Sequence, residues 1–110
     1  MLALILASSS QYRRALLERL QLPFTAVSPG VDEPPRPGEA PVDLVGRLGE
    51  AKARAAAAGR RGALVIGSDQ VAECEGRVLG KPGDHAGAAR QLAALSGRRV
   101  SFLTSLCVLN

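Results

Sequence analysis

Short apolar runs punctuate this chain, and polar residues follow each run directly. One run extends from Leu2 to Ala7, and another occupies residues 63–67 and leads into Ser68 and Asp69. A continuous apolar run of this length, bounded by turn residues, is typical of a strand that is buried on both faces. Ligands of open α/β sheets bind just beyond the carboxyl ends of such strands. The pattern therefore predicts that Asp69 lies beyond a strand end, where it either serves a ligand site or merely caps a turn.

Helical spacing of apolar residues predicts three helices. The first begins near Tyr12, the second extends from Pro41 to about Ala58, and the third follows Asp84. The residues expected to face the core are Ala15, Leu16, Leu17 and Leu20 in the first helix, Leu44, Leu48, Ala51 and Ala55 in the second, and Ala88, Leu92 and Leu95 in the third.

Three further stretches complete the predicted sheet. Strands are expected at residues 24–28 and 99–109, and a hairpin that turns at Glu75 and Gly76 is expected at residues 71–79. The alternation of strands and helices predicts an α/β fold. A chain of 110 residues is long enough for one domain, residues 1–110, and too short for two.

Charge and cysteine content narrow the class of function. The net charge of +4 suits an anionic partner, but the basic residues are scattered and no basic tract carries aromatic residues, so a specific nucleic-acid surface is not favoured. Phosphate on a small molecule explains the charge equally well. The apolar start is too short for a membrane span and lacks a positive region. Two distant cysteines and one histidine do not make a zinc site and favour reduced thiols in a cytoplasm.

A candidate anion site lies where the first strand meets the first helix. Ser8, Ser9 and Ser10 follow the strand, and Ser9 or Ser10 can cap the helix. Free N–H groups, hydroxyl donors and the positive end of the helix dipole would meet there. Arg13 and Arg14 stand in the first turn, where two cations conflict with the dipole. A bound phosphate would remove that conflict; alternatively, both arginines point to water.

Two lysines and an acidic pair extend the candidate site. The chain has twelve arginines but only Lys52 and Lys81, so an ammonium group at these positions is notable. Lys52 flanks the buried face of the second helix and either reaches a cleft or simply snorkels to water. Lys81 lies on a stiff Gly-Lys-Pro turn that is not a P-loop. Asp32 and Glu33 lie in a proline-rich loop, residues 29–39, which serves either to hold a functional side chain or as a solvated turn.

Together these groups suit a polyphosphate and a divalent cation. A metal ion would bridge phosphate oxygens and lower the pKa of a water molecule. Asp69 would activate that water as general base, while Arg13 and Lys81 would stabilise the developing charge.

The same segments, in the same order, resemble the Maf family of nucleoside triphosphate pyrophosphatases. The matching motifs are LILASSSQYRR (residues 4–14), VDE (31–33), AKA (51–53), IGSDQ (66–70), LGKPG (79–83) and, over residues 91–97, QL followed by LSG. The resemblance implies hydrolysis between the α and β phosphates, which yields a nucleoside monophosphate and pyrophosphate. It also implies Mg²⁺ or Mn²⁺ as cofactor and an elongated α/β fold, a mixed sheet with flanking helices and a cleft between two lobes.

Positions carried over from the family define the expected site. The family's active-site set falls on Ser8, Arg13, Glu33, Lys52, Asp69 and Lys81. Asp69 is the implied proton acceptor, and Glu33 and Asp69 are the expected metal ligands. We expect the substrate to be bound by Ser8, Ser10, Arg13, Arg14, Lys52 and Lys81.

Tyr12 and Gln70 fall where subfamilies of Maf proteins differ in the base they accept. Members that act on dTTP and UTP generally carry Arg and Thr there. Tyr with Gln resembles the subfamily that hydrolyses 7-methyl-GTP, and a ring at Tyr12 could stack on a cationic methylated purine.

The chain departs from the family in two respects. Gln11 stands where the family usually has Pro, which would loosen the serine loop. Family members are nearly twice as long, so the C-terminal part of the fold is expected to be missing, and the chain is either a truncated product or a fragment that pairs with a second copy. Two alternatives to an active enzyme follow: a module that binds nucleotide without turnover, or a regulator of septum formation, with which the family has been associated.

Overall fold

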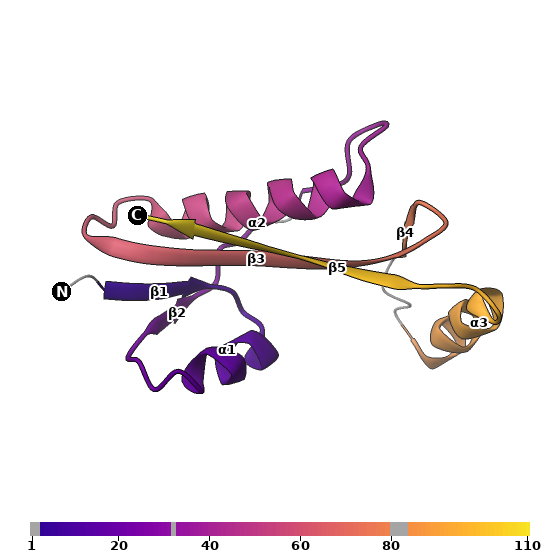
Figure 1. The fold of residues 1–110 in the computed structure, drawn as a ribbon, viewed down its shortest axis with the longest axis horizontal. Helices are drawn as coiled ribbons and strands as arrows, with labels where there is room; N and C mark the ends of the chain where they lie inside the picture. Colours follow the sequence, from indigo (N-terminus) through magenta and orange to yellow (C-terminus); the bar gives the residue numbers. More distant parts are fainter. Residues whose placement is uncertain (1–2, 32, 80–83) are drawn as a thin grey trace.

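The computed structural model describes residues 3–31, 33–79 and 84–110. Within these residues it has a five-stranded mixed sheet and three helices, so the predicted α/β fold with flanking helices is confirmed (Figure 1). In chain order the elements are β1 (Ala3–Ala7), α1 (Gln11–Glu18), β2 (Thr25–Val27), α2 (Pro41–Ala57), β3 (Ala63–Cys74), β4 (Arg77–Leu79), α3 (His85–Leu95) and β5 (Ser101–Leu109). The molecule is elongated, with extents of 50 × 30 × 21 Å.

The long strand β3 is the axis of the sheet. β1 pairs with it in parallel over residues 63–67, and β5 pairs with it in antiparallel fashion over residues 65–73. Because β5 supplies backbone partners well past Gly67, the strand continues through Asp69 to Cys74. The prediction that Asp69 lies beyond the carboxyl end of its strand is therefore wrong.

Pairing on the other side of β3 is interrupted. Opposite β5, the parallel partner β1 ends at the level of Gly67, and the antiparallel partner β4 begins at the level of Ala72. Residues 68–71 consequently have no strand on that side within the described part of the chain. Asp69 thus lies beyond the carboxyl end of a strand after all, but the strand that ends there is the neighbour β1 and not β3.

Helix α2 covers one face of the sheet, along β3 and β5 (Figure 1). It starts at Pro41, as predicted, and Gly59 follows its end with a φ of 73°. Its buried residues are Leu44, Val45, Gly49, Ala53 and Ala56. The predicted stripe is correct only at Leu44, because Leu48 and Ala51 are half-buried and Ala55 is exposed.

Close packing explains this shift of the buried stripe. A Cβ added at Gly67 of β3 would lie 2.6 Å from the backbone nitrogen of Ala53 and 2.7 Å from its Cβ. A Cβ added at Gly49 would overlap Oγ of Ser105 in β5. The smallest residues on both elements let α2 lie directly on the sheet, so residue size, as well as apolarity, decides which face is buried.

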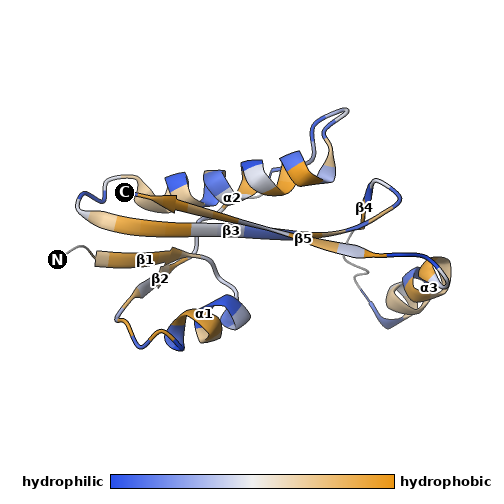
Figure 2. Cartoon of the chain, in the orientation of Figure 1, coloured by the Kyte–Doolittle hydropathy of each residue, from blue (hydrophilic) through white to orange (hydrophobic). Residues whose placement is uncertain are grey.

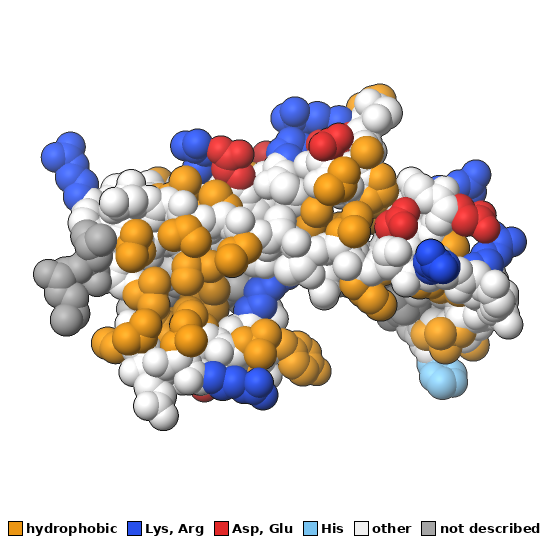
Figure 3. Space-filling view, in the orientation of Figure 1, with side chains coloured by type: hydrophobic (Ala, Val, Ile, Leu, Met, Phe, Trp, Pro, Cys, Tyr) orange, Lys and Arg blue, Asp and Glu red, His pale blue; other side chains and the backbone are white. Residues whose placement is uncertain are grey.

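The opposite face of the sheet is largely open. Neither α1 nor α3 has a buried residue, and Leu16, Leu20 and Leu92 are 59%, 60% and 71% exposed. The prediction that these leucines face the core is therefore wrong. β5 alternates half-buried and exposed residues along its length. Apolar residues occur on α1 and along the strands in Figure 2, and apolar side chains gather on the face seen in Figure 3.

The turn after β3 and the burial of β3 can be compared with the predictions. Glu75 and Gly76, with φ angles of 54° and 81°, form the predicted hairpin turn between β3 and β4. The half-buried Leu64 and Ile66 show that β3 is buried mainly on the α2 face and not on both faces.

In the part of the chain that the structure describes, no helix combines the length and the apolar character needed to span a membrane.

Candidate functional site

A cavity of about 600 Å³ opens where the pairing of β3 is interrupted. Its wall consists of the loop after β1, one residue of α1, the residues that follow β2 into the proline-rich loop, one residue of α2 and two of β3. The lining residues are Ser8, Ser9, Ser10, Arg13, Ser28, Pro29, Gly30, Val31, Lys52, Asp69 and Gln70. The structure therefore brings together Ser8, Ser10, Arg13, Lys52, Asp69 and Gln70 from the predicted set.

An ion pair between α2 and β3 lies in this cavity. Nζ of Lys52 donates to Oδ1 of Asp69 at 2.8 Å, and the two side chains are 19% and 14% exposed. The close approach of α2 to Gly67 brings the lysine stem within reach of β3. On the other side, the N–H of Asp69 donates to Oγ of Ser105 at 3.1 Å, which ties the backbone of Asp69 to β5. Asp69 is thus held by α2 through its carboxylate and by β5 through its backbone.

The serine loop organises itself through its own hydroxyl groups. Oγ of Ser10 accepts the N–H of Arg13 at 3.3 Å. Of the two serines that could cap the helix, Ser9 and Ser10, the cap is therefore Ser10. Oγ of the buried Ser8 accepts the N–H of Ser10 at 3.0 Å. The N–H groups of Ser10 and Arg13 are therefore bonded to the serine loop itself. This capping fixes the start of α1 beside the cavity.

The two arginines of the first turn lie in different surroundings. The half-buried Arg13 lines the cavity, whereas Arg14 lies outside the lining residues and pairs with Glu18, Nε to Oε1, at 3.5 Å. Both partners of that pair are well exposed, at 62% and 59% of their side chains, so the pair contributes little. A substrate-binding role for Arg14 stays a prediction.

A second cavity of about 610 Å³ adjoins the first and shares Ser10, Arg13 and Gln70 with it. Tyr12 joins its wall, which is otherwise mainly apolar: Leu6, Leu16, Leu17, Leu20, Ile66 and Leu106, with Ser68 and Thr104. Nε2 of Gln70 donates to Oγ1 of Thr104 at 3.1 Å, and Tyr12 is 86% exposed. The two predicted base-selecting residues thus share one apolar cavity beside the polar one.

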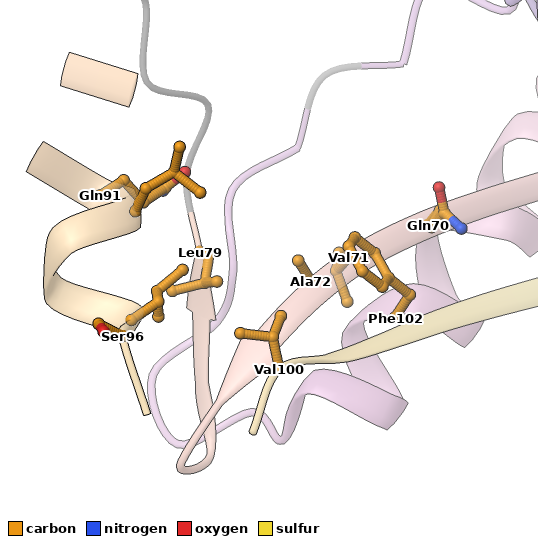
Figure 4. Close-up of a pocket in the computed structure, with 10 residues that line it drawn as sticks. Gln70, Val71, Ala72, Leu79, Gln91, Ser96, Val100 and Phe102 are labelled. Atoms are coloured by element: carbon orange, nitrogen blue, oxygen red, sulfur yellow. The ribbon is translucent and has the colours of Figure 1, made fainter. Parts of the chain in front are cut away.

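Gln70 also reaches a third cavity, of about 750 Å³, toward the far end of the sheet. Figure 4 shows residues of this cavity on α3, β4, β3 and β5, among them Leu79, Gln91 and Phe102, with Val100 just before β5. Arg13 and Asp69 do not line it. The charged groups of the site therefore meet the first cavity and not this one.

Glu33 lies outside the lining residues, in a cluster built around Arg47. Nη1 of Arg47 donates to Glu33, while its Nε and Nη2 donate to the two carboxylate oxygens of Glu39 at 2.8 and 2.9 Å. The hydrogen bond from Arg47 and a second one from the N–H of Arg36 lower the pKa of Glu39 from 4.5 to about 2. The same carboxylate raises the pKa of Arg47 above its ordinary value. Asp32 and Lys81 lie outside the described residues.

The donors of the cavity suit a metal ion that is shared with a substrate. Among the described residues no group of three His, Cys, Asp or Glu side chains could hold a metal, and Asp69 is the carboxylate that lines the cavity. Mg²⁺ is commonly held by one or two carboxylates together with substrate phosphates and water. The oxygen atoms of Asp69, Ser8 and Ser10 fit that chemistry.

Sequence reasoning missed residues that act at long range. Ser105 supports Asp69, Gly49 and Gly67 bring α2 to the sheet, and Arg47 holds the proline-rich loop. No local pattern pairs Glu33 or Glu39 with Arg47, because this contact requires the loop to fold back on α2. Nothing in the local sequence pairs Ser105 with Asp69, because β5 follows β3 only after the hairpin and α3.

Comparison with known proteins gives consistent matches. A family model described as Maf-like protein matches residues 3–110. The 7-methyl-GTP pyrophosphatase of Bordetella pertussis is 61% identical over 105 residues, which are 96% of this chain and 53% of that protein. Proteins of the same name from Ralstonia nicotianae and Pseudomonas syringae pv. tomato are 58% and 56% identical, over 96% and 98% of this chain and 54% and 56% of their own lengths. The chain spans about half the length of these relatives.

Proposed function

The chain belongs to the Maf family, and from this premise we propose that it is a nucleoside triphosphate pyrophosphatase that converts 7-methyl-GTP into 7-methyl-GMP and pyrophosphate. The observation that carries the proposal is the cavity at the interruption of β3. Cationic Arg13 and Lys52 and the hydroxyl groups of Ser8 and Ser10 line it around the carboxylate of Asp69. The names of the relatives supply the substrate.

The triphosphate would occupy the polar cavity. Arg13 presents a planar guanidinium that can bind two phosphate oxygens at once, and Lys52 supplies a compact charge. The Ser10 cap, with the hydrogen bond between Ser8 and Ser10, holds the backbone of Arg13 at the start of α1, beside the cavity that Arg13 lines. Arg14 is proposed as a further phosphate ligand from its place in the first turn of the helix, and Lys81 from its place on the Gly-Lys-Pro turn and from the family resemblance.

Asp69 would act as the general base. Its carboxylate takes a proton from a water molecule whose oxygen forms a new bond to phosphorus, while the bridging bond between the α and β phosphates breaks and pyrophosphate leaves. The hydrogen bonds from Lys52 and to Ser105 orient the residue for this step. Lys52 and Arg13 stabilise the negative charge that develops on the phosphate oxygens.

We propose Mg²⁺ or Mn²⁺ as cofactor, held by Asp69 and by phosphate oxygens of the substrate. A bound divalent ion polarises phosphoryl oxygens and lowers the pKa of coordinated water. Glu33 is proposed as a second ligand from the family resemblance; in the structure it pairs with Arg47 instead.

The apolar cavity would receive the base. N7 methylation gives guanine a positive charge, and the ring of Tyr12 can attract a cation with about 0.5–2 kcal/mol. Gln70 lines both cavities, and its bond to Thr104 orients its amide between them. Phosphate and base sites therefore adjoin at Gln70.

We also propose a cytoplasmic location and pairing of the chain with a second copy. Cys74 and Cys107 are free thiols, as expected in a reducing compartment. Self-pairing predicts a mass of two chains by analytical ultracentrifugation.

Pyrophosphate release from 7-methyl-GTP, GTP, dTTP and UTP, with Mg²⁺ or Mn²⁺, tests the function. We expect release to be greatest with 7-methyl-GTP and to fall about 10²- to 10⁴-fold in Asp69→Asn. Asp43→Asn is the matched control, because Asp43 is exposed in the first turn of α2.

Three results would contradict the proposal in different ways. Preference for dTTP or UTP would support the proposed reaction but contradict the proposed substrate. Metal-dependent binding without product would indicate a binding module, and unchanged release in Asp69→Asn would overturn the role of that residue.

Tyr12→Phe should keep the preference for 7-methyl-GTP over GTP, and Tyr12→Ala should lose it.

A further inference from the structure

Arg47 of α2 attaches the proline-rich loop to the helix at two places. Its Nε and Nη2 grip the two carboxylate oxygens of Glu39, and Nη2 also donates to the backbone oxygen of Pro34 at 3.0 Å. Nη1 donates to Glu33. The side chains of Arg47 and Glu39 are 17% and 10% exposed, so this two-pronged contact is shielded from water. One guanidinium thereby fixes residues 33–34 and residue 39 to α2.

The same loop begins as a wall of the polar cavity. Ser28, Pro29, Gly30 and Val31 line the cavity, whereas Arg47 does not. Glu33 and Pro34 follow closely in the chain, and the prolines of the loop limit its backbone freedom. The contacts of Arg47 with Glu33 and Pro34 therefore begin only two positions after Val31, the last residue of that wall.

We infer that Arg47 is a positioning residue for the substrate's phosphate chain, an inference that rests on the proposed function. It holds the wall formed by residues 28–31 at the width of the cavity that a bound triphosphate needs, and it does so without touching the substrate. Its partner Glu39 belongs to the same device, because Glu39 fixes two of the donor atoms of Arg47 and also accepts the N–H of Arg36 at 3.1 Å.

The test compares Arg47→Lys with Arg54→Lys. Arg54 lies on the same helix, but it pairs with Glu50 of that helix, at 2.8 Å, and this pair is exposed. The probes are 7-methyl-GMP and a 7-methyl-GTP analogue with a methylene bridge between the α and β phosphates, both with Mg²⁺. We expect Arg47→Lys to bind the triphosphate analogue about tenfold more weakly, the size of one lost charge-assisted contact.

Two further readouts separate positioning from general damage. The monophosphate should bind Arg47→Lys within about twofold of the wild type. General loss of the fold would instead weaken the binding of both ligands alike. Amide hydrogen exchange should become faster in residues 28–31 and 33–39 and stay unchanged in α2 and β3. Glu39→Gln should reproduce the weaker triphosphate binding, and the double variant should add little, because the two residues act as one unit.

The outcomes distinguish this inference from the function on which it rests. A wild-type chain that binds neither probe overturns the proposed function and this role of Arg47 with it. A wild-type chain that binds the triphosphate analogue no better than Arg47→Lys does overturns the inference alone. Equal weakening of both ligands, or faster exchange throughout the sheet, assigns Arg47 to overall stability and also overturns it.

Discussion

The two faces of the sheet are built by different means. On the face covered by α2, glycine and alanine bring helix and strands into direct contact, and Leu44, Val45 and Val65 are at most 3% exposed. On the other face, larger apolar residues are present but remain open, with Leu106 at 73% and Phe102 at 69%. Close packing therefore follows the shape of the paired surfaces more than their hydrophobicity.

This difference decides how firmly each half of the site is held. Lys52 and Asp69 lie on the closely packed α2 face, and a short ion pair joins them. Tyr12 and the apolar cavity lie on the open face, where α1 has no buried residue. The catalytic part of the proposed site is thus rigid in construction, and the base-binding part is shaped mainly by one exposed helix.

The largest expected effect tests the covered face directly. Leu44→Ala should lower the free energy of unfolding by about 2–5 kcal/mol, because it removes a buried side chain and leaves a cavity. Val42→Ala, on the same helix and 63% exposed, should change it by no more than about 0.5 kcal/mol. Urea denaturation of the two variants measures the contrast. Equal losses would show that α2 does not pack on the sheet as described.

The next effect concerns the contact that brings Lys52 to Asp69. Gly67→Ala should cost about 1–3 kcal/mol, because its new Cβ would lie 2.7 Å from Cβ of Ala53 and must push α2 away. Denaturant unfolding measures this loss, and weaker nucleotide binding should accompany it. Gly46→Ala is the control on α2, since nothing lies within 4 Å of its new Cβ. That variant should gain roughly 0.5–1 kcal/mol from helix propensity.

The bounds of α2 and the start of α1 could be predicted from the sequence. Pro41 and Gly59 mark the two ends of α2, and Ser10 was one of two candidate caps of α1. These signals are local: each depends on a residue's own backbone preference or on a neighbour a few positions away. The predicted residues Ser8, Arg13, Lys52 and Asp69 line one cavity, although the close packing of α2 on Gly67 that brings Lys52 to Asp69 was not predicted.

The rest depended on partners far away in the chain. Gly67-Ser68-Asp69 has the composition of a turn, yet β5 pairs with all three residues and keeps them in a strand. Helical periodicity identified the apolar faces of α1 and α3, but periodicity does not specify what covers them. The bonds from Arg47 to Glu33 and Glu39 likewise require the loop to fold back on α2.

A smaller effect is expected where the proline-rich loop meets α2. The pKa of Glu39 is lowered to about 2 in the folded chain, against an ordinary value of 4.5, by its hydrogen bonds with Arg47 and Arg36. A lowered pKa means that this contribution is complete above about pH 4.5 and is lost as the pH falls toward about 2. The difference in free energy of unfolding between wild type and Glu39→Gln should therefore shrink over that range. A difference that stays constant from pH 7 to pH 2.5 would contradict this assignment.

The smallest effect is expected on the open face and completes the comparison. Leu16→Lys replaces an apolar side chain of α1 that is 59% exposed, and leucine and lysine have similar helix propensities. The free energy of unfolding should therefore change by no more than about 0.5 kcal/mol. Denaturation is measured at two protein concentrations, because a second copy seated on this face would make the stability depend on concentration. A loss of about 2 kcal/mol or more at both concentrations would mean that α1 packs within the chain, and the two faces would then differ much less than their exposures indicate.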